Sequence, residues 1–297
     1  MASRSADTRQ RFLIETCDVR GQIVHLDKTW QAAIARIDYP DTVKQVLGEA
    51  FVAASLLAGT IKYQGRMTFQ VRGDGPVHLL VVQVTNDGKL RGLARFGSTP
   101  MSTNTQTVFG DRASLTITIE ANEYSEPYQG IVPLEGDTLS AVLAAYFHTS
   151  EQLSTQLHLH VSDSAAAGML LQKLPAEEQH ADDADGWQRA TVLADTLTSE
   201  EILSASAERL LHTLYHEEQV RLFGESSLEF HCSCSKERSD GLLVGLGEEE
   251  VMSIIEERKL VEITCEFCDA QYRYDAVDVS ALFKATPGTQ SSADTQH

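Results

Sequence analysis

"FHCSCSKERSDGLLVGLGEEEVMSIIEERKLVEITCEFCDAQY" (residues 230–272) holds four of the five cysteines of this chain. They form a C-x-C pair, Cys232 and Cys234, and after thirty residues a C-x-x-C pair, Cys265 and Cys268. Zn²⁺ prefers four thiolates in a tetrahedron, and two short-range pairs separated by a longer loop are a usual way to build a closed structural site. The pattern predicts a zinc-binding domain over residues 228–285 that holds one Zn²⁺ on these four cysteines.

Other interpretations of these residues are weaker. Four reduced thiols in a core would also produce the pattern, whereas a catalytic zinc is disfavoured because four cysteines leave no open position for water. His231 is interpreted as a bystander, since the four cysteines complete the ligand shell. Cys17, with no thiol or evident base near it in the sequence, is interpreted as a small structural residue.

Composition narrows the class of protein. The chain has 297 residues, 42% of them hydrophobic, which is enough for one large domain with smaller appendages. Its formal net charge is −19, and residues 228–284 carry six basic against thirteen acidic side chains. Because nucleic-acid affinity depends largely on Lys and Arg, this balance argues against nucleic acid as a partner and against a nucleic-acid-binding zinc ribbon.

Neither a membrane-spanning segment nor a secretory signal is evident in the sequence. No apolar run approaches the roughly 20 residues of a membrane-spanning helix, and the N-terminal segment lacks an apolar stretch followed by a cleavage site. We therefore expect a cytoplasmic protein that does not bind membranes, with its thiols kept reduced.

Residues 1–175 mix strand and helix periodicities, which predicts an α+β core domain: a β-sheet with packed helices. Runs at 65–71, 76–85 and 89–96 are separated by Asp-Gly turns and predict a meander, and residues 114–121 and 155–162 alternate as half-buried strands. Helices are expected from Pro40 to about Ile61 and from Asp137, as N-cap, to about Gln152. His158 and His160 are expected on the polar face of their strand, in solvent.

Residues 176–227 predict a linker, first acidic and then helical. Thr198 and Glu201 have the spacing of a capping box and begin one amphipathic helix. Such a short helix is marginal away from a partner, so the segment should fold conditionally, by docking. Residues 241–247 predict a turn into a helix, and residues 286–297 a disordered tail. The expected docking face consists of Leu203, Ala207, Leu210, Leu211 and Leu214.

Zinc on four thiolates also suggests a redox sensor, because a coordinated thiolate keeps electron density that a peroxide can attack. Metal binding contributes on the order of 10 kcal/mol of folding free energy in zinc-dependent peptides. Oxidation that expels the zinc should therefore unfold the small domain. If the linker depends on that domain, an apolar surface beneath it would open.

Several segments resemble the Hsp33 family of redox-regulated chaperones. They are "EPYQGIVPLEGDTLSAVLAAYFHTSEQLSTQL" (126–157), "AAAGMLLQKLP" (165–175), "TLYHEEQV" (213–220), "HCSCSKER" (231–238) and "CEFCDAQY" (265–272). The resemblance implies an ATP-independent holdase of the bacterial cytoplasm, not an enzyme, that binds unfolded client proteins and no nucleotide. Its core domain would bind clients and dimerise.

For the cysteines, the resemblance implies zinc and inactivity in the reduced state. Oxidation would form the disulfides Cys232–Cys234 and Cys265–Cys268, unfold the linker and produce a homodimer. Neither disulfide bridges the thirty-residue loop, a constraint worth roughly 3 to 4 kcal/mol. A glycine often follows the second pair in the family where this chain has Asp269; Asp tolerates left-handed backbone better than most residues.

The alternative function is a thiol-disulfide oxidoreductase that uses Cys265 and Cys268. Such an enzyme would place its C-x-x-C at the start of a helix in a thioredoxin-like domain. Here the motif leads into a strand-like run, "AQYRYD", and the C-x-C pair would have no role.

Overall fold

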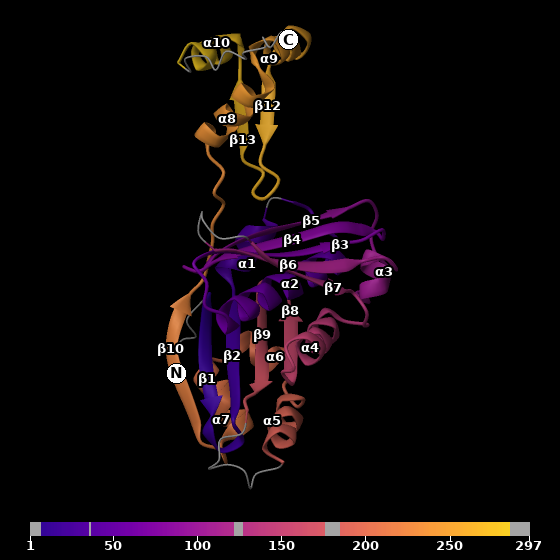
Figure 1. The fold of residues 1–297 in the computed structure, drawn as a ribbon, viewed down its shortest axis with the longest axis vertical. Coiled ribbons are helices and arrows are strands. Elements are labelled where there is room, and N and C mark those ends of the chain that lie inside the picture. Colours follow the sequence, from indigo (N-terminus) through magenta and orange to yellow (C-terminus); the bar gives the residue numbers. More distant parts are fainter. Residues whose placement is uncertain (1–6, 36, 122–126, 176–184, 286–297) are drawn as a thin grey trace, which may run out of the picture. The chain divides into compact units, whose positions relative to one another are not determined.

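A computed structural model describes residues 7–35, 37–121, 127–175 and 185–285. The described residues up to His231 form one compact unit and those from Cys232 onward form a second (Figure 1). The predicted acidic stretch, apart from Asp185, and the predicted tail lie outside the described residues. The α+β class predicted from the sequence is confirmed.

Two sheets make up the first unit, and their strand neighbours are antiparallel except for β11 and β5, which are parallel. The five-stranded sheet has the order β10 (Val220–Ser227), β1 (Thr8–Ile14), β2 (Val19–Leu26), β9 (Ala166–Lys173), β8 (Thr155–Val161). The six-stranded sheet has the order β11 (Glu229–Phe230), β5 (Lys89–Phe96), β4 (Val77–Thr85), β3 (Gly65–Arg72), β6 (Ser114–Ala121), β7 (Tyr128–Pro133). The predicted meander is thus β3, β4 and β5.

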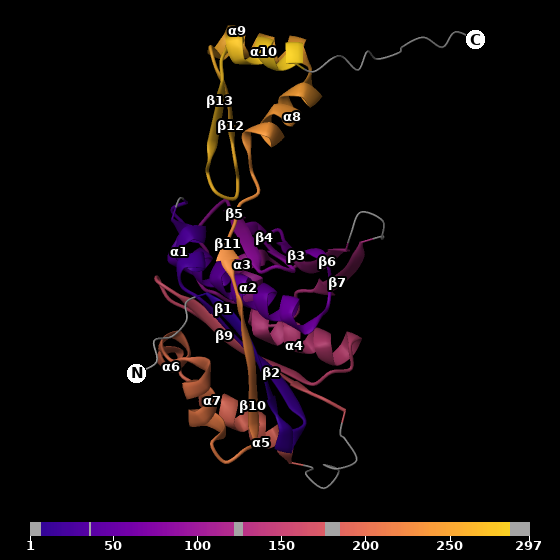
Figure 2. The same ribbon diagram turned by 90° about the vertical axis from the view of Figure 1, so that its left-hand side faces the viewer.

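Helix α2 (Asp41–Thr60) lies between the two sheets, where both figures place it (Figures 1 and 2). It buries thirteen residues, among them Phe51 and Leu56, against apolar side chains of both sheets. This near-continuous burial explains why the segment is apolar on every side and not along one stripe. Four further elements complete this part of the unit: η1 (Glu15–Cys17), α1 (Lys28–Ile34), α3 (Thr105–Phe109) and α4 (Leu139–Ser150).

The opposite face of the five-stranded sheet is covered by the linker helices α5 (Gly186–Ala194), α6 (Ser199–Ser204) and α7 (Ala207–Tyr215). Their apolar side chains form a second core with Phe12 and Ile14 of β1 and Met169 of β9. Figure 2 shows these helices beside the sheet and separate from α2. The linker therefore folds as part of the first unit.

The single amphipathic helix expected from Thr198 onward is wrong in two respects. The capping box of Thr198 and Glu201 is present, but α6 ends at Ser204 and α7 starts anew with Ser206 as its N-cap. The chain after Tyr215 then leaves the helix, and Val220–Ser227 pairs with β1 as strand β10. Pairing with a distant strand overrides the local helical tendency there.

Two local predictions in the first unit are corrected. Thr138, not Asp137, caps α4, because its hydroxyl accepts a hydrogen bond from the Ala141 amide at 3.2 Å. Strand β8 exposes its histidines less than predicted, since the linker covers them: the His158 side chain is 14% exposed, and His160 Nδ1 lies 2.8 Å from Ser199 Oγ. Burial lowers the pKa of both histidines.

The second unit is a hairpin, β12 (Val261–Thr264) and β13 (Gln271–Tyr274), with helices α8 (Lys236–Leu246), α9 (Glu248–Arg258) and α10 (Ala276–Ala285). Its core holds six buried apolar side chains, including Val251 and Tyr274. Residues 241–246, expected as a turn, form the end of α8, and the turn is confined to Gly247, whose φ is +92°. Among the helices that the structure describes, none is long and apolar enough to cross a membrane.

Candidate metal centre

The first cysteine pair lies in extended chain just before α8. Ser235 follows Cys234 and caps the helix, because its hydroxyl accepts a hydrogen bond from the Arg238 amide at 3.3 Å. The Arg238 guanidinium donates back to the Ser233 hydroxyl, which lies between the two cysteines, at 2.7 Å. Helix α8 thus fixes the path of the short C-x-C segment from both its backbone and its side chains.

The second pair occupies the turn of the β12–β13 hairpin. The Cys265 amide donates to the Ala270 carbonyl at 2.9 Å, and the Asp269 amide donates to the Cys265 carbonyl at 2.7 Å. These bonds close the turn around Cys268. Asp269 has a φ of +56°, so its backbone is left-handed, and Asp accommodates this conformation as expected.

The two pairs meet in one cluster. All four sulfur atoms lie within 4.8 Å of one another, with Cys232 and Cys265 3.5 Å apart and Cys234 and Cys268 3.3 Å apart. A tetrahedral zinc site with Zn–S bonds of about 2.3 Å places its sulfurs about 3.8 Å apart. The four sulfurs therefore have the composition and the spacing of a closed metal site, and all four cysteines are free thiols.

Burial and mutual repulsion of the thiolates oppose the simultaneous ionisation of all four thiols. Burial raises the pKa of Cys232 and Cys268. Burial also acts to raise the pKa of Cys234, but hydrogen bonds from the Tyr272 hydroxyl and from the other cysteines outweigh it and lower that pKa to about 7. Four thiolates so close together need a central cation to offset their repulsion.

Tyr272 is a further site residue, which the cysteine motifs alone do not indicate. Its side chain hydrogen-bonds to Cys234, a contact that raises the pKa of the tyrosine to about 12. The alternation in "QYRY" could have indicated it, because Tyr272 and Tyr274 lie on the same side of β13. The partners of Tyr274 are different: its hydroxyl donates to Asp240 at 2.8 Å, and Lys236 Nζ lies 4.6 Å from the centre of its ring.

The small core makes the second unit dependent on this cluster. Six buried apolar side chains are few for the described residues 232–285, and small domains with such cores usually need disulfides or a metal. The cysteines join the start of α8 to the hairpin across thirty residues of intervening chain. A bound metal would supply the cross-link that the apolar core lacks.

The residues expected on the docking face of the linker are placed in the first unit. Ala207, Leu210, Leu211 and Leu214 are buried, and Leu203 is partly buried against the same core. They contact the side chains of β1, β2 and β9 through the second apolar core. Polar contacts accompany this packing, such as His25 Nε2 of β2, which lies 2.9 Å from the Ile202 carbonyl of α6.

Known proteins are similar to this chain over most of its length. The family model described as "Hsp33 protein" matches residues 7–275. The chain belongs to the Hsp33 family.

Curated relatives of this Hsp33 family member are named 33 kDa chaperonin. Those of Pseudomonas fluorescens (strain SBW25) and Shewanella denitrificans are each 43% identical, over 295 and 289 residues; the matches cover 98% and 97% of this chain and 98% and 99% of those proteins. The crystal structure of the 33 kDa chaperonin of Thermotoga maritima has the same fold, with a TM-score of 0.75, 21% identity, and coverage of 94% of this chain and 98% of that one.

Membership of the Hsp33 family and the chaperonin names of the relatives are consistent with a non-enzymatic chaperone. The four-cysteine cluster adds a metal-binding site. The thiol-disulfide oxidoreductase alternative has little structural support. Its C-x-x-C would need a helix N-terminus to stabilise the thiolate, but Cys265 and Cys268 lie in a hairpin turn that continues into β13.

Proposed function

We propose that this protein is a redox-regulated, ATP-independent holdase that protects unfolding proteins from aggregation. The observation that carries the proposal is the cluster formed by four thiols from both ends of a thirty-residue segment, in a unit whose described residues bury only six apolar side chains in their core. Family membership and the chaperonin relatives support the client-binding part. The protein would act in the cytoplasm, without nucleotide or nucleic acid.

In the reduced state, Cys232, Cys234, Cys265 and Cys268 would hold one Zn²⁺. The four-sulfur set favours zinc over harder cations such as Mg²⁺ or Ca²⁺, which take oxygen ligands. When bound, Zn²⁺ supplies the positive charge that keeps all four sulfurs ionised. The cysteines in turn hold α8 against the β12–β13 hairpin, and the unit stays folded.

Oxidation would convert the four thiolates to two disulfides, Cys232–Cys234 and Cys265–Cys268. For each disulfide, one sulfur attacks a peroxide oxygen, the second sulfur displaces the resulting hydroxyl group, and two electrons pass to the peroxide, which takes up two protons and leaves as two waters. Sulfurs in disulfides are poor ligands, so the metal would leave. The thirty-residue loop would then have no cross-link, and the second unit would unfold.

The linker would respond because it continues directly into the second unit. Strand β11 ends at Phe230, two residues before Cys232. Unfolding of the chain after Cys232 would remove one anchor of the linker, residues 176–227. The linker would then be held only by its docking to the core domain, residues 1–175. Undocking would uncover the apolar face of β1, β2 and β9 for clients and for a second copy of the chain. The zinc domain would comprise residues 228–285, and the tail residues 286–297.

The activity test compares reduced, zinc-loaded protein with peroxide-treated protein on a thermally unfolding client enzyme, without nucleotide, by light scattering. The oxidised form should suppress aggregation at near-stoichiometric ratios, and the reduced form should not. Equal suppression by both forms would remove the redox switch from the proposal. Catalytic reduction of insulin by the protein would favour the oxidoreductase instead.

Peptide mapping of the oxidised protein tests the pairing. The sulfur contacts of 3.5 Å between Cys232 and Cys265 and of 3.3 Å between Cys234 and Cys268 join one pair to the other. Such cross-linked disulfides would keep the thirty-residue loop closed and the unit compact. The proposal requires the two local pairs, and a dominant cross-linked form would contradict its unfolding step.

A further inference from the structure

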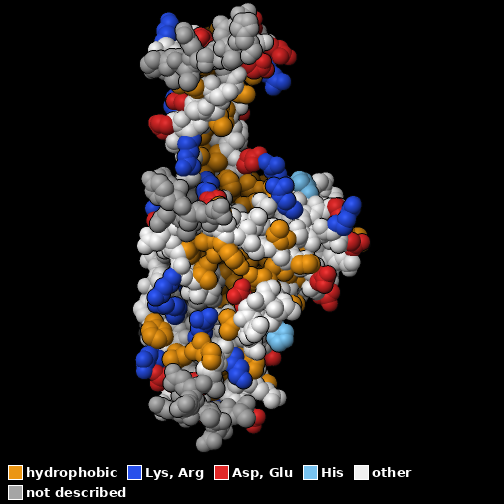
Figure 3. Space-filling view, viewed as in Figure 1, with side chains coloured by type: hydrophobic (Ala, Val, Ile, Leu, Met, Phe, Trp, Pro, Cys, Tyr) orange, Lys and Arg blue, Asp and Glu red, His pale blue; other side chains and the backbone are white. Residues whose placement is uncertain are grey.

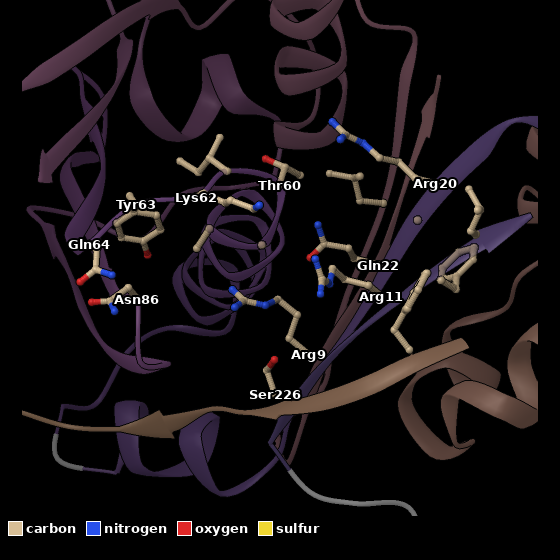
Figure 4. Close-up of a pocket in the computed structure, with 18 residues that line it drawn as sticks. Arg9, Arg11, Arg20, Gln22, Thr60, Lys62, Tyr63, Gln64, Asn86 and Ser226 are labelled. Carbon is tan, nitrogen blue, oxygen red and sulfur yellow. The ribbon is translucent and has the colours of Figure 1, made fainter. Parts of the chain in front are cut away.

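A large cavity lies in the first unit, away from the cysteines, where α2 ends beside the five-stranded sheet. Its volume is about 930 Å³, and its walls are built by β1, β2 and β10, by the end of α2 and by the turn between β4 and β5. Figure 4 shows the polar side chains around this space, and in Figure 3 Lys and Arg side chains lie among hydrophobic ones over the same part of the unit.

Charge distinguishes this cavity from the rest of the molecule. Four cationic side chains line it, and no Asp or Glu is among the described lining residues. The whole chain carries 43 acidic against 24 basic residues, so an acid-free cavity with several cations is a strong departure from the average. The four cations are Arg9, Arg11, Arg20 and Lys62.

Two of the four cations already have partners inside the fold. Arg9 Nη1 donates to the Ser55 carbonyl of α2 at 3.2 Å, and Arg20 donates to Gln172 Oε1 at 2.7 and 3.0 Å. Arg9 is thereby held against the side of α2. The side chains of Arg11 and Lys62 are more exposed, and Figure 4 shows Lys62 extending from the end of α2 into the space that Arg9 and Arg11 border.

A buried amide completes the polar lining. Gln22 is only 5% exposed, and its Oε1 has no hydrogen-bond partner among the described residues. This oxygen is a hydrogen-bond acceptor, so only a donor such as a water molecule satisfies it, and contacts to an anion come from the cationic side chains. Gly59 makes room for it, because a Cβ there would lie 1.9 Å from Gln22 Oε1 and 2.7 Å from Arg9 Cδ.

From this geometry we propose that the cavity binds a small anion that carries two or more phosphate groups. Several cations around one space, two of them arginines beside each other on β1, suit phosphate oxygens, which guanidinium groups bind in a bidentate manner. A single phosphate would leave most of a cavity of this volume empty. The apolar wall, which includes Leu13, Ile61 and Leu170, offers contacts to a nonpolar part of the same molecule.

The cavity is completed by the linker. Phe223 and Ser226 of β10 line it, and Arg11 Cζ lies 5.9 Å from the centre of the Phe223 ring. An anion that binds only the complete cavity stabilises the docked linker, and at one hundred times its dissociation constant it disfavours undocking by about a hundredfold. This consequence for switching rests on the function proposed above, whereas binding itself does not.

The test is calorimetric titration of reduced, zinc-loaded, full-length protein with sodium pyrophosphate in 0.15 M NaCl. We expect one saturable site per chain. The double variant Arg11→Ala/Lys62→Ala should weaken binding by about tenfold or more, since each lost charge-assisted hydrogen bond contributes a factor of that order. The matched control, Lys28→Ala/Arg112→Ala, removes the same charge from exposed positions outside the cavity and should change the affinity by less than about twofold.

Absence of saturable pyrophosphate binding, or an equal loss of affinity in both double variants, would overturn the proposed site. Titration with ADP identifies the source of the phosphate groups: tighter binding than pyrophosphate indicates a nucleotide that also uses the apolar wall, and equal or weaker binding indicates a free oligophosphate. Hydrogen exchange of residues 220–227 with and without pyrophosphate tests the coupling. Slower exchange supports it, and unchanged exchange at saturation overturns the coupling alone.

Discussion

Arg189 of α5 forms an ion pair with Glu218, which lies in the loop after α7, with 2.6 Å between Nε and Oε1. The Glu218 side chain is only 9% exposed, and it also accepts a hydrogen bond from the Thr16 hydroxyl of η1. Arg189 Nη2 lies 3.3 Å from Cys17 Sγ in the same element. This cluster of polar side chains thus connects both ends of the linker helices to the sheet that they cover.

Replacing Arg189 should loosen the linker without changing the metal site. Arg189→Ala leaves Glu218 partly buried without its cation, which should cost about 1 to 3 kcal/mol of docking free energy. Hydrogen exchange over residues 186–215 should speed up in the reduced, zinc-loaded protein. The control Arg209→Ala removes an exposed arginine of α7 and should leave the exchange unchanged, and equal effects of both variants would contradict this account.

The same pair predicts how docking depends on pH. Burial acts to raise the pKa of Glu218, but hydrogen bonds from Arg189 and Thr16 outweigh it and hold that pKa below its ordinary value of 4.5. A depressed pKa stabilises the folded state above the ordinary value, and this contribution is lost as the pH falls through the lowered pKa. The fluorescence of Trp187 in α5 should report undocking in acid. The Glu218→Gln variant, which lacks the ionised carboxylate at every pH, should undock at a higher pH than the wild-type protein.

Apolar packing should dominate the docking of the linker. Leu211 is 3% exposed in the core shared with β1, β2 and β9, and Leu211→Ala should cost about 2 to 5 kcal/mol. On the proposed function, this variant should suppress client aggregation in the reduced state, while exposed Thr213→Ala in the same helix should stay inactive. If reduced Leu211→Ala shows rapid hydrogen exchange over the linker but does not suppress aggregation, undocking of the linker is not what produces activity.

Metal removal should unfold the second unit. Cys265→Ser should lower zinc affinity and speed up hydrogen exchange over residues 232–285 under reducing conditions, because one of four ligands is lost from a unit with a small core. Chelation of the wild-type protein should produce the same pattern. The matched control is Cys17→Ser, whose sulfur lies outside the cluster. Full zinc affinity in Cys265→Ser would mean that the ligand set is wrong.

Patterns local in sequence predicted much of the structure. The C-x-C and C-x-x-C pairs, the Asp-Gly turns of the meander and the capping box of Thr198 each act over a few residues, and the structure contains them all. The small second unit and the apolar segment of α2 follow from the same short-range signals. These features need no knowledge of distant partners.

Features that depend on distant partners were missed. Strand β10 follows a helical pattern, and only its pairing with β1, some 210 residues earlier, makes Val220–Ser227 a strand. The covered state of His158 depends on Asp195 of the linker, 3.8 Å away. The cation-lined cavity combines β1, β2, α2 and β10, which no single window of sequence contains.

The chain passes from one sheet of the first unit to the other as it runs from β10 into β11. Strand β10 pairs with the edge of one sheet, and β11 pairs with β5 at the edge of the other. Gly88 permits this close passage, since a Cβ there would lie 2.3 Å from the Ser227 carbonyl. Withdrawal of both β10 and β11 would therefore free two rows of main-chain amides and carbonyls. Such edges can accept any extended polypeptide as an added strand, so recognition there would not depend on the side chains of the incoming chain.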